Sequence, residues 1–307
     1  KGVHFMISST ESENKEFKKI GVVGIGTMGQ IIMEKLLESG YVVNVFDVSP
    51  QSLVIAREKG ANVADTPADL AAISDLIFMS LPGTNQIEEV IFGENGMLEC
   101  LNSGTIIADT STVDPKTTKS VAKRLSVKEV GYLDCPILGR PSAAGNWLLP
   151  VGGNINDLER VTPVLKSFAS TIIHVGESGA GNAVKLLNQM MFTVINAVSS
   201  EVMAIADYCG VSKDVFYNTV AGSSAATVSG LFKEVGKNIV ANDFEHPTFT
   251  VDLLIKDTKL ALQMAKDAGA PSIMAGTAQL YNDIATANGY GKEDTSALYK
   301  TYKRHFN

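Results

Sequence analysis

Two polar residues three positions apart, Lys185 and Asn188, have the chemistry and the spacing of a proton-transfer pair. Within a helix they share one face with Gly181 and Phe192, because residues three or four apart lie above one another. Apolar residues surround the lysine, so closing this face against another domain would remove water from the ammonium group. Its pKa would then fall toward the range of a general acid or base. Asn188 can hold a substrate hydroxyl or orient the ammonium group, and we expect both residues to be catalytic.

A glycine-rich loop near the start of the chain has the spacing of a dinucleotide-binding turn. Gly24 permits a tight turn, Gly26 lets the backbone approach a pyrophosphate, and Gly29 allows close packing of helix on strand. An apolar strand precedes the loop and an amphipathic helix follows it, whose first N–H groups can bind phosphates. We therefore expect the whole loop to bind a cofactor, namely Gly24, Ile25, Gly26, Thr27, Met28 and Gly29.

Asp47 follows the second expected strand, where a carboxylate can accept hydrogen bonds from the hydroxyls of an adenosine ribose. The same charge would repel a 2′-phosphate, and neither Val48 nor Ser49 offers a compensating positive charge. This pattern favours NAD over NADP as the cofactor. An arginine from elsewhere in the chain, or a purely solvated strand-end role for Asp47, remains compatible with the sequence.

The elements that position these residues alternate between short apolar runs and helical patterns up to about residue 176. Candidate strands lie at 20–23, 42–46, 76–79, 105–108 and 131–134, with two more near 148–151 and 172–175. Helical patterns lie between the first strands, at 28–39, 50–59, 67–73, 84–92 and 115–128. This rhythm is typical of a parallel sheet covered on both faces.

Beyond residue 179 the apolar runs give way to helical periodicity. Expected helices cover 180–208, 212–221, 226–239, 250–268 and 272–288. The fold class is therefore α/β, with a Rossmann-type doubly wound domain at 18–176 followed by an all-helical domain at 177–307. A long helix from about residue 181 joins the two.

Composition narrows the partners of the chain. A net charge of -7 over 307 residues, with no basic block, argues against nucleic acid. No run approaches the roughly 18 uninterrupted apolar residues of a membrane span. The three cysteines are far apart and form no CxxC pair, which disfavours disulfides and a metal site and fits a reducing cytoplasm. Residues 1–17 lack the pattern of a signal peptide.

From residue 18 nearly to its end, the chain resembles the β-hydroxyacid dehydrogenase family, which includes 3-hydroxyisobutyrate dehydrogenases and reductases of tartronate semialdehyde, glyoxylate and succinic semialdehyde. The motifs that carry the resemblance are the glycine loop, Leu81-Pro82, Asp109-Thr110-Ser111-Thr112, the run 179–189 and Lys256-Asp257.

The resemblance implies that Lys185 is the catalytic acid and base, with Asn188 beside it. It also implies a cofactor wall made of Leu81, Pro82, Gln86, Thr112 and Lys256. A homodimer or homotetramer is implied as well, and the apolar helices after residue 180 exceed what a small helical domain would bury alone.

One motif departs from the family pattern. Where the family commonly has Asp-Ala-Pro-Val-Ser-Gly-Gly, residues 134–140 read Asp-Cys-Pro-Ile-Leu-Gly-Arg, so Leu138 replaces a substrate-holding serine. We expect Leu138, Gly139 and Arg140 to bind substrate together with Asn188. Leu138 then indicates a substrate with an apolar group and Arg140 a carboxylate contact, unless either side chain turns away from the cleft.

These features predict reversible hydride transfer between a nicotinamide cofactor and a small β-hydroxyacid or its semialdehyde, with Lys185 moving the proton. Two alternatives stay open. The apolar Leu138 leaves room for an imine reductase, although pockets of that class usually lack the lysine. A dinucleotide-binding module without catalysis is the other, which retention of Lys185, Asn188 and Lys256 disfavours.

Overall fold

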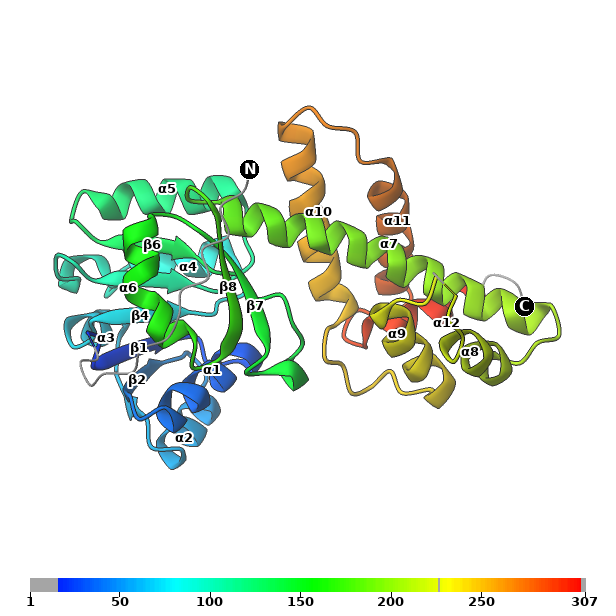
Figure 1. The fold of residues 1–307 in the computed structure, drawn as a ribbon, viewed down its shortest axis with the longest axis horizontal. Helices are drawn as coiled ribbons and strands as arrows, with labels where there is room; N and C mark the ends of the chain where they lie inside the picture. The colour runs from blue at the N-terminus through cyan, green and yellow to red at the C-terminus, as the bar shows by residue number, and fades with distance from the viewer. Residues whose placement is uncertain (1–15, 226, 305–307) are drawn as a thin grey trace.

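The chain folds into an α/β domain and a helical domain that are connected by one long helix (Figure 1). The computed structural model describes residues 16–225 and 227–304. The expectation that the chain begins without a signal peptide falls mostly on residues 1–15, which lie outside the described residues, as do the last three residues of the expected helical domain.

The α/β domain is built on one eight-stranded sheet in the order β3-β2-β1-β4-β5-β6-β7-β8. Its strands are β1 (Lys19–Val23), β2 (Val42–Phe46), β3 (Asn62–Val63), β4 (Leu76–Met79), β5 (Ile106–Asp109), β6 (Gly131–Asp134), β7 (Trp147–Gly152) and β8 (Ala169–Gly176). All neighbours pair in parallel except β6 and β7, which are antiparallel. The strand order reverses between β1 and β4, and ligands of such sheets bind at the carboxyl ends beside this point.

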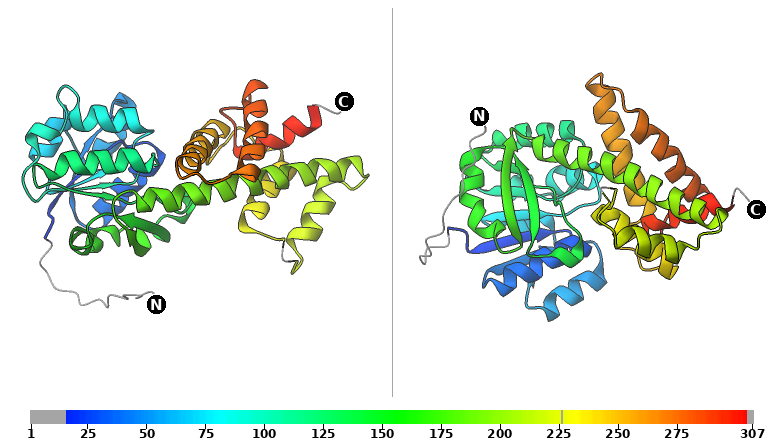
Figure 2. Two further views of the ribbon diagram at one scale, coloured as in Figure 1. Left: turned by 90° about the horizontal axis from the view of Figure 1, so that it is seen from above. Right: turned by 45° about the vertical axis from the view of Figure 1, so that its right-hand side comes forward.

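Helices cover both faces of the sheet (Figure 2). They are α1 (Thr27–Glu38), α2 (Pro50–Glu58), α3 (Pro67–Ala72), α4 (Thr84–Phe92), α5 (Pro115–Ser126) and α6 (Ile155–Leu165), with short 3-10 turns η1 (Leu98–Cys100) and η2 (Pro141–Ala143). Along β4, Phe78 packs in a core with α1 and α6, whereas Ile77 and Met79 pack in a second core with α4 and α5. Both faces of β4 are buried, which explains its continuous apolar sequence.

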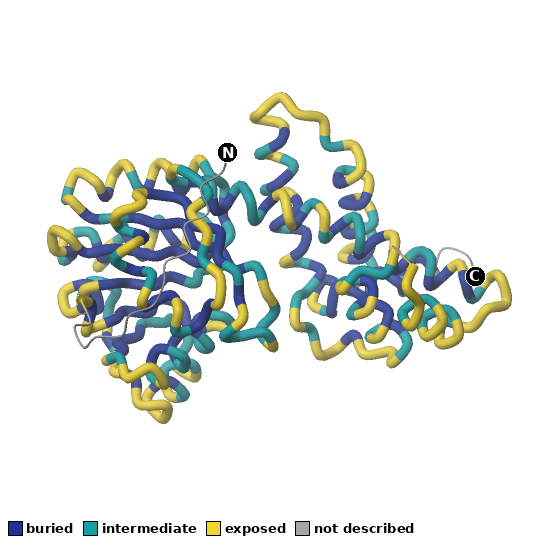
Figure 3. The backbone as a smooth tube through the Cα atoms, viewed as in Figure 1, coloured by how far each residue is buried: buried dark blue, intermediate teal, exposed yellow. Residues whose placement is uncertain are grey.

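The helical domain is formed by α7 (Ala180–Tyr208), α8 (Lys213–Ala221), α9 (Gly230–Ala241), α10 (Val251–Asp267), α11 (Ile273–Ala287), η3 (Thr295–Ala297) and α12 (Leu298–Arg304). The long helix α7 contacts every other helix of this domain and also β7 and β8 of the α/β domain. Buried residues recur along α7 from its first turn, beside the α/β domain, to its last turns within the helical domain (Figure 3). It is therefore the element that fixes one domain relative to the other.

The expected fold class is confirmed, while several elements differ from the sequence expectation. The strand β3 and the helices α6 and α12 were not predicted, and β7 departs from the expected parallel arrangement. Strand β3 has two residues, too few to show a period. Pro163 lies inside α6, where it interrupts the helical signal, although the side chain of Asn154 caps the helix start.

By length and composition α7 could also cross a membrane. Among the described residues, one helix passes this test, and it is α7. The sequence expectation concerned uninterrupted apolar runs, and α7 contains no such run because polar residues interrupt its apolar ones. Half of the most apolar window is buried inside the protein, and the buried Asn196 and Thr193 side chains bond to Thr295 and Asn282 of the helical domain. These contacts are those of a core helix, because polar groups buried in protein need partners.

Candidate active site

The glycine loop between β1 and α1 has the backbone geometry of a dinucleotide turn. Gly24 has a positive φ of 83°, and a side chain on Gly29 would overlap the carbonyl oxygen of Gly24. An added Cβ on Gly26 would instead meet no described atom within 4 Å. The fold therefore requires Gly24 and Gly29, whereas the space beside Gly26 is open to a ligand at the start of α1.

Asp47 braces this loop. One oxygen of its carboxylate accepts a hydrogen bond from the Ile25 N–H at 2.7 Å, and the other accepts one from the Ser49 N–H at 2.8 Å. A carboxylate has further lone pairs, so these bonds leave acceptor capacity for a ribose hydroxyl. The side chain of Val48 points into solvent and is 90% exposed.

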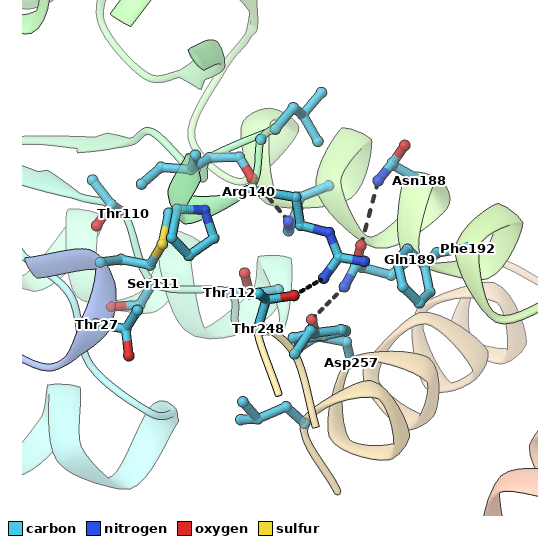
Figure 4. A pocket seen from close by; sticks show the side chains of 18 of the residues that line it. Thr27, Thr110, Ser111, Thr112, Arg140, Asn188, Gln189, Phe192, Thr248 and Asp257 are labelled. Carbon is cyan, nitrogen blue, oxygen red and sulfur yellow. Dashed lines mark hydrogen bonds between the residues drawn. The ribbon is translucent and has the colours of Figure 1, made fainter. Parts of the chain in front are cut away.

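A cavity of about 500 Å³ lies between the carboxyl ends of the strands and the helical domain (Figure 4). Eleven of the residues expected to bind cofactor, bind substrate or act in catalysis line it, namely Thr27, Met28, Leu81, Pro82, Thr112, Leu138, Gly139, Arg140, Lys185, Asn188 and Lys256. The other six, Gly24, Ile25, Gly26, Gly29, Asp47 and Gln86, do not line it. The first five belong to the loop and its brace, and Gln86 lies exposed on α4.

A buried carboxylate holds the first turn of α7 against the sheet. Asp134, at the end of β6, accepts hydrogen bonds from the N–H groups of Gly179 and Asn182, both at 2.8 Å. Burial raises the pKa of Asp134, and these backbone bonds oppose the rise. A Cβ on Gly181 would approach the Asp134 carbonyl oxygen to 2.5 Å, so glycine permits this contact. Sequence reasoning missed this role of Asp134, which fixes the helix that carries Lys185.

Lys185 points into the cavity as the helix-face argument expects. Its Nζ donates a hydrogen bond to the Ile137 carbonyl oxygen at 2.8 Å. Burial lowers the pKa of Lys185; the negative charge of Asp257 opposes this, and the positive charges of Lys256 and Arg140 reinforce it. A partly desolvated ammonium with N–H groups to spare is suited to exchange a proton with a ligand oxygen.

Beside Lys185, three polar side chains form a row (Figure 4). Asn188 Nδ2 donates to Gln189 Oε1 at 3.3 Å, and Gln189 Nε2 donates to Asp257 Oδ2 at 2.7 Å. Sequence reasoning gave no role to Gln189 or Asp257. Their positions in the sequence could have indicated a role, because Gln189 follows Lys185 by one helical turn and Asp257 follows Lys256 directly.

Lys256 crosses from α10 to the α/β domain. Its Nζ donates to the carbonyl oxygens of Pro82 at 3.2 Å and Thr112 at 3.1 Å, and it lies 3.0 Å from Asp257 Oδ1. The lysine thus connects the loops after β4 and β5 to the helical domain. This is the part of the cavity wall to which the family resemblance assigns it.

Residues 138–140 form the opposite edge of the cavity. The backbone of Leu138 pairs with Leu148, and Gly139 leaves no room for a side chain beside the Trp147 indole. Arg140 turns toward the helical domain, where it donates to Thr248 Oγ1 at 3.1 Å and lies 3.1 Å from Glu234 Oε1.

The guanidinium of Arg140 also lies 5.3 Å from the centre of the Phe192 ring. A guanidinium has five N–H donors, so these contacts leave donors for an anionic ligand.

Beneath the cavity, Asp109 is fully buried and accepts hydrogen bonds from the Ser111 N–H at 2.9 Å and the Tyr132 hydroxyl at 2.6 Å. Burial raises its pKa to about 6, although both bonds oppose the rise. Ser111 Oγ in turn accepts from the Leu81 N–H at 2.8 Å. Asp109 therefore shapes two loops of the cofactor wall from below.

Within the described residues, no group of three or more His, Cys, Asp or Glu side chains could hold a metal ion. The three cysteines are free, and burial raises the pKa of the Cys135 thiol. A thiol in that state is a poor nucleophile.

The class of protein follows from the fold, the cavity and two family models. Residues 19–176 match the NAD binding domain of 6-phosphogluconate dehydrogenase, and residues 179–302 match the NAD-binding domain of NADP-dependent 3-hydroxyisobutyrate dehydrogenase. The chain is thus an NAD(P)-binding oxidoreductase with two domains.

Full-length relatives narrow this class to a family. The chain is 32% identical to 2-(hydroxymethyl)glutarate dehydrogenase from Eubacterium barkeri, covering 93% of this chain and 95% of the relative. It is 32% identical to 3-sulfolactaldehyde reductase from Escherichia coli, with coverages of 91% and 94%. The crystal structure of 3-hydroxyisobutyrate dehydrogenase from Salmonella typhimurium superimposes with a TM-score of 0.84 at 29% identity, covering 92% and 99%. The chain belongs to the β-hydroxyacid dehydrogenase family, also called the 3-hydroxyisobutyrate dehydrogenase family.

Proposed function

We propose that this dehydrogenase interconverts a small β-hydroxyacid and its semialdehyde, with Lys185 as the general acid and base. The observation that carries the proposal is the position of Lys185, whose ammonium group enters the cavity and has a pKa lowered mainly by burial. A bound nicotinamide dinucleotide would supply or accept the hydride. In the reducing direction Lys185 gives a proton to the carbonyl oxygen, and in the oxidising direction it takes the hydroxyl proton.

The residues of the α/β domain fit a dinucleotide, and we propose NAD as the preferred form. The open space beside Gly26 and the start of α1 would receive the pyrophosphate, while Leu81, Pro82, Thr112 and Lys256 would line the nicotinamide end. Gln86 would contact the cofactor from α4. Asp47 supports NAD because its carboxylate would attract ribose hydroxyls and repel a 2′-phosphate.

The residues at the edge of the cavity formed by 138–140 favour a small acid with an apolar portion as the substrate. Leu138 and the ring of Phe192 offer apolar surface, and Arg140 with Asn188 offers polar contacts. Arg140 is already paired with Glu234, so an anionic group bound there would share the guanidinium.

We also propose that the protein assembles as a homodimer or homotetramer through α7. Leu187, Met191, Val198 and Ile205 are 54%, 64%, 47% and 50% exposed, and their spacing places them on one stripe of the helix. An exposed apolar stripe of this length is typical of an interface. Light scattering that finds only monomers at assay concentrations would contradict this assembly.

Two further assignments belong to the proposal. The domain boundary falls near residue 176, because β8 ends at Gly176 and α7 begins at Ala180. The cytoplasm is the proposed compartment, based on three free cysteines, among which Cys209 is exposed.

The test combines a substrate panel with one substitution. Oxidation of NADH and NADPH is measured with small semialdehydes, keto acids and cyclic imines, for the wild type and for Lys185→Ala. We expect the wild type to favour a semialdehyde with NADH. In Lys185→Ala, kcat should fall roughly 100- to 10,000-fold, the usual contribution of a general acid, with NADH affinity retained.

The panel also separates the alternatives. Faster reduction of a cyclic imine than of any semialdehyde would favour an imine reductase, and tight NADH binding without turnover would favour a non-catalytic module. Near-normal turnover of a confirmed semialdehyde by Lys185→Ala would remove the proposed mechanism.

A further inference from the structure

We propose that Asp257 is a positioning residue that fixes, through Gln189, which end of the Asn188 amide faces a ligand. Asp257 lies on α10 in the cavity wall and is 4% exposed. One carboxylate oxygen bonds to Gln189, and the other lies 3.0 Å from the ammonium group of Lys256. This inference rests on the proposed function, since it assigns a direction to the partner of Lys185.

The direction follows from donor and acceptor chemistry. An ionised carboxylate only accepts hydrogen bonds, so Gln189 must turn its NH₂ group toward Asp257, as it does at 2.7 Å. The carbonyl oxygen of Gln189 then faces the other way and accepts from the Asn188 NH₂ group at 3.3 Å. The Oδ1 atom of Asn188 is thereby directed away from Gln189. Asn188 thus acts as an acceptor, suited to a substrate hydroxyl or to the ammonium group of Lys185.

Asp257 also balances the charges around Lys185. The charged side chains that line the cavity are Arg140, Lys185, Glu234, Lys256 and Asp257. Glu234 is 3.1 Å from Arg140, whereas Asp257 is paired with Lys256. Burial, Lys256 and Arg140 lower the pKa of Lys185, and Asp257 opposes them. Without the Asp257 charge, the lysine would deprotonate at lower pH.

The first experiment replaces the carboxylate by its isosteric amide in Asp257→Asn. The pKa of Lys185 is measured without any ligand, by NMR of ¹³C-methylated lysines, and we expect it to fall by about one pH unit, as for a unit charge several ångströms away. Activity with NADH and the fastest semialdehyde among malonate, methylmalonate and succinate semialdehydes should fall roughly 10- to 100-fold in kcat/KM, the effect of one charge-assisted hydrogen bond. The alkaline limb of the reduction profile should move to lower pH.

The matched control is Asp267→Asn, at the end of the same helix. Like Asp257, Asp267 pairs with a lysine, but its partner is Lys116 of the α/β domain, and the pair lies on the exposed surface away from the cavity. We expect it to leave both the pKa of Lys185 and kcat/KM unchanged. A shift in this control equal to that in Asp257→Asn would overturn the assignment, because the loss of any carboxylate on this helix would then suffice.

The decisive variant moves the carboxylate from position 257 to its hydrogen-bond partner at position 189. In the double variant Asp257→Asn with Gln189→Glu, the new glutamate accepts from both the new asparagine and Asn188, so the direction of Asn188 is restored. We expect kcat/KM to recover at least severalfold over Asp257→Asn, whereas Gln189→Glu alone places two carboxylates together and should be impaired. A folded double variant no more active than Asp257→Asn would overturn the proposal.

Failure of this inference is distinguishable from failure of the proposed function. If Lys185→Ala loses turnover while Asp257→Asn leaves the Lys185 pKa and kcat/KM as in the wild type, the role of Asp257 alone is wrong. If Lys185→Ala keeps its turnover, the proposed function fails and this inference falls with it.

Discussion

The α/β domain and the helical domain contribute to the cavity in different ways. On the α/β side the lining residues come from the start of α1 and from the loops after β4, β5 and β6. On the helical side it consists of side chains from two helices, Lys185, Asn188 and Lys256. Binding groups thus come from turns that the sheet fixes, and the proposed chemistry comes from side chains that a second domain brings to them.

Carboxylates stabilise the site in both domains, but some of them bind backbone groups and another binds side chains. Asp47 and Asp134 accept hydrogen bonds from backbone N–H groups and so fix the path of the chain. Asp257 instead contacts the side chains of Gln189 and Lys256. We therefore expect changes on the α/β side to alter cofactor binding and stability, and changes on the helical side to alter turnover and its pH dependence.

The largest effects that we expect come from two glycines of the α/β domain, and they differ in whether stability or only NADH binding is lost. Gly29→Ala would overlap the Gly24 carbonyl and should destabilise the fold by about 3 kcal/mol or more, with loss of NADH binding. Gly26→Ala meets no described atom within 4 Å and has a φ of -67°, so the apoprotein should keep its stability. The affinity for NADH should still fall roughly 10- to 100-fold, which corresponds to about 1.4 to 2.8 kcal/mol of binding free energy.

Urea unfolding and NADH fluorescence titration measure the two effects. The comparison between the domains would break if Gly26→Ala bound NADH as the wild type does.

A second prediction concerns the buried Asp109, whose pKa is raised to about 6 in the folded protein. A raised pKa means that the folded state favours the protonated acid, so stability is greatest below the unfolded value and falls as pH rises through about 6. Asp109→Asn keeps an acceptor for Ser111 and removes this cost. Its unfolding free energy should exceed that of the wild type by up to about 3 kcal/mol at pH 8 and by only about 1 kcal/mol at pH 4.5.

Urea titrations across this pH range provide the measurement. A difference that does not grow with pH would show that the Asp109 charge costs nothing in the fold.

The smallest effect expected concerns cofactor choice. Val48→Arg adds a positive charge beside Asp47 at a side chain that is 90% exposed, and it leaves the bonds of Asp47 intact. We expect the ratio of kcat/KM for NADPH over NADH to rise about tenfold, or about 1.4 kcal/mol, while the pH profile stays unchanged. Val48→Gln provides a neutral side chain of similar length as control. An equal rise in that control would assign the effect to size, and a moved pH profile would break the separation of the two sides.

The parts of this molecule that the sequence predicts are those with local signals. The alternation of strands and helices, the glycine turn and the long helix at 180–208 agree with the structure because each depends on neighbouring residues. Strand β3 is too short to carry a period, and Pro163 masks α6. The role of Gln189 and Asp257 was not predicted, because it depends on a contact between residues 68 positions apart.

By itself, the sequence determined the α/β and helical order of the chain, the family, and the helix face on which Lys185 and Asn188 lie. Only the tertiary structure decided that Asp134 holds the start of α7, that Lys256 bonds to carbonyls 174 and 144 residues away, and that Asp257 lies beside Gln189. The physical reason is range. Turn geometry and helix periodicity arise between neighbours, whereas burial and the electrostatic field at Lys185 depend on which distant groups the fold brings together.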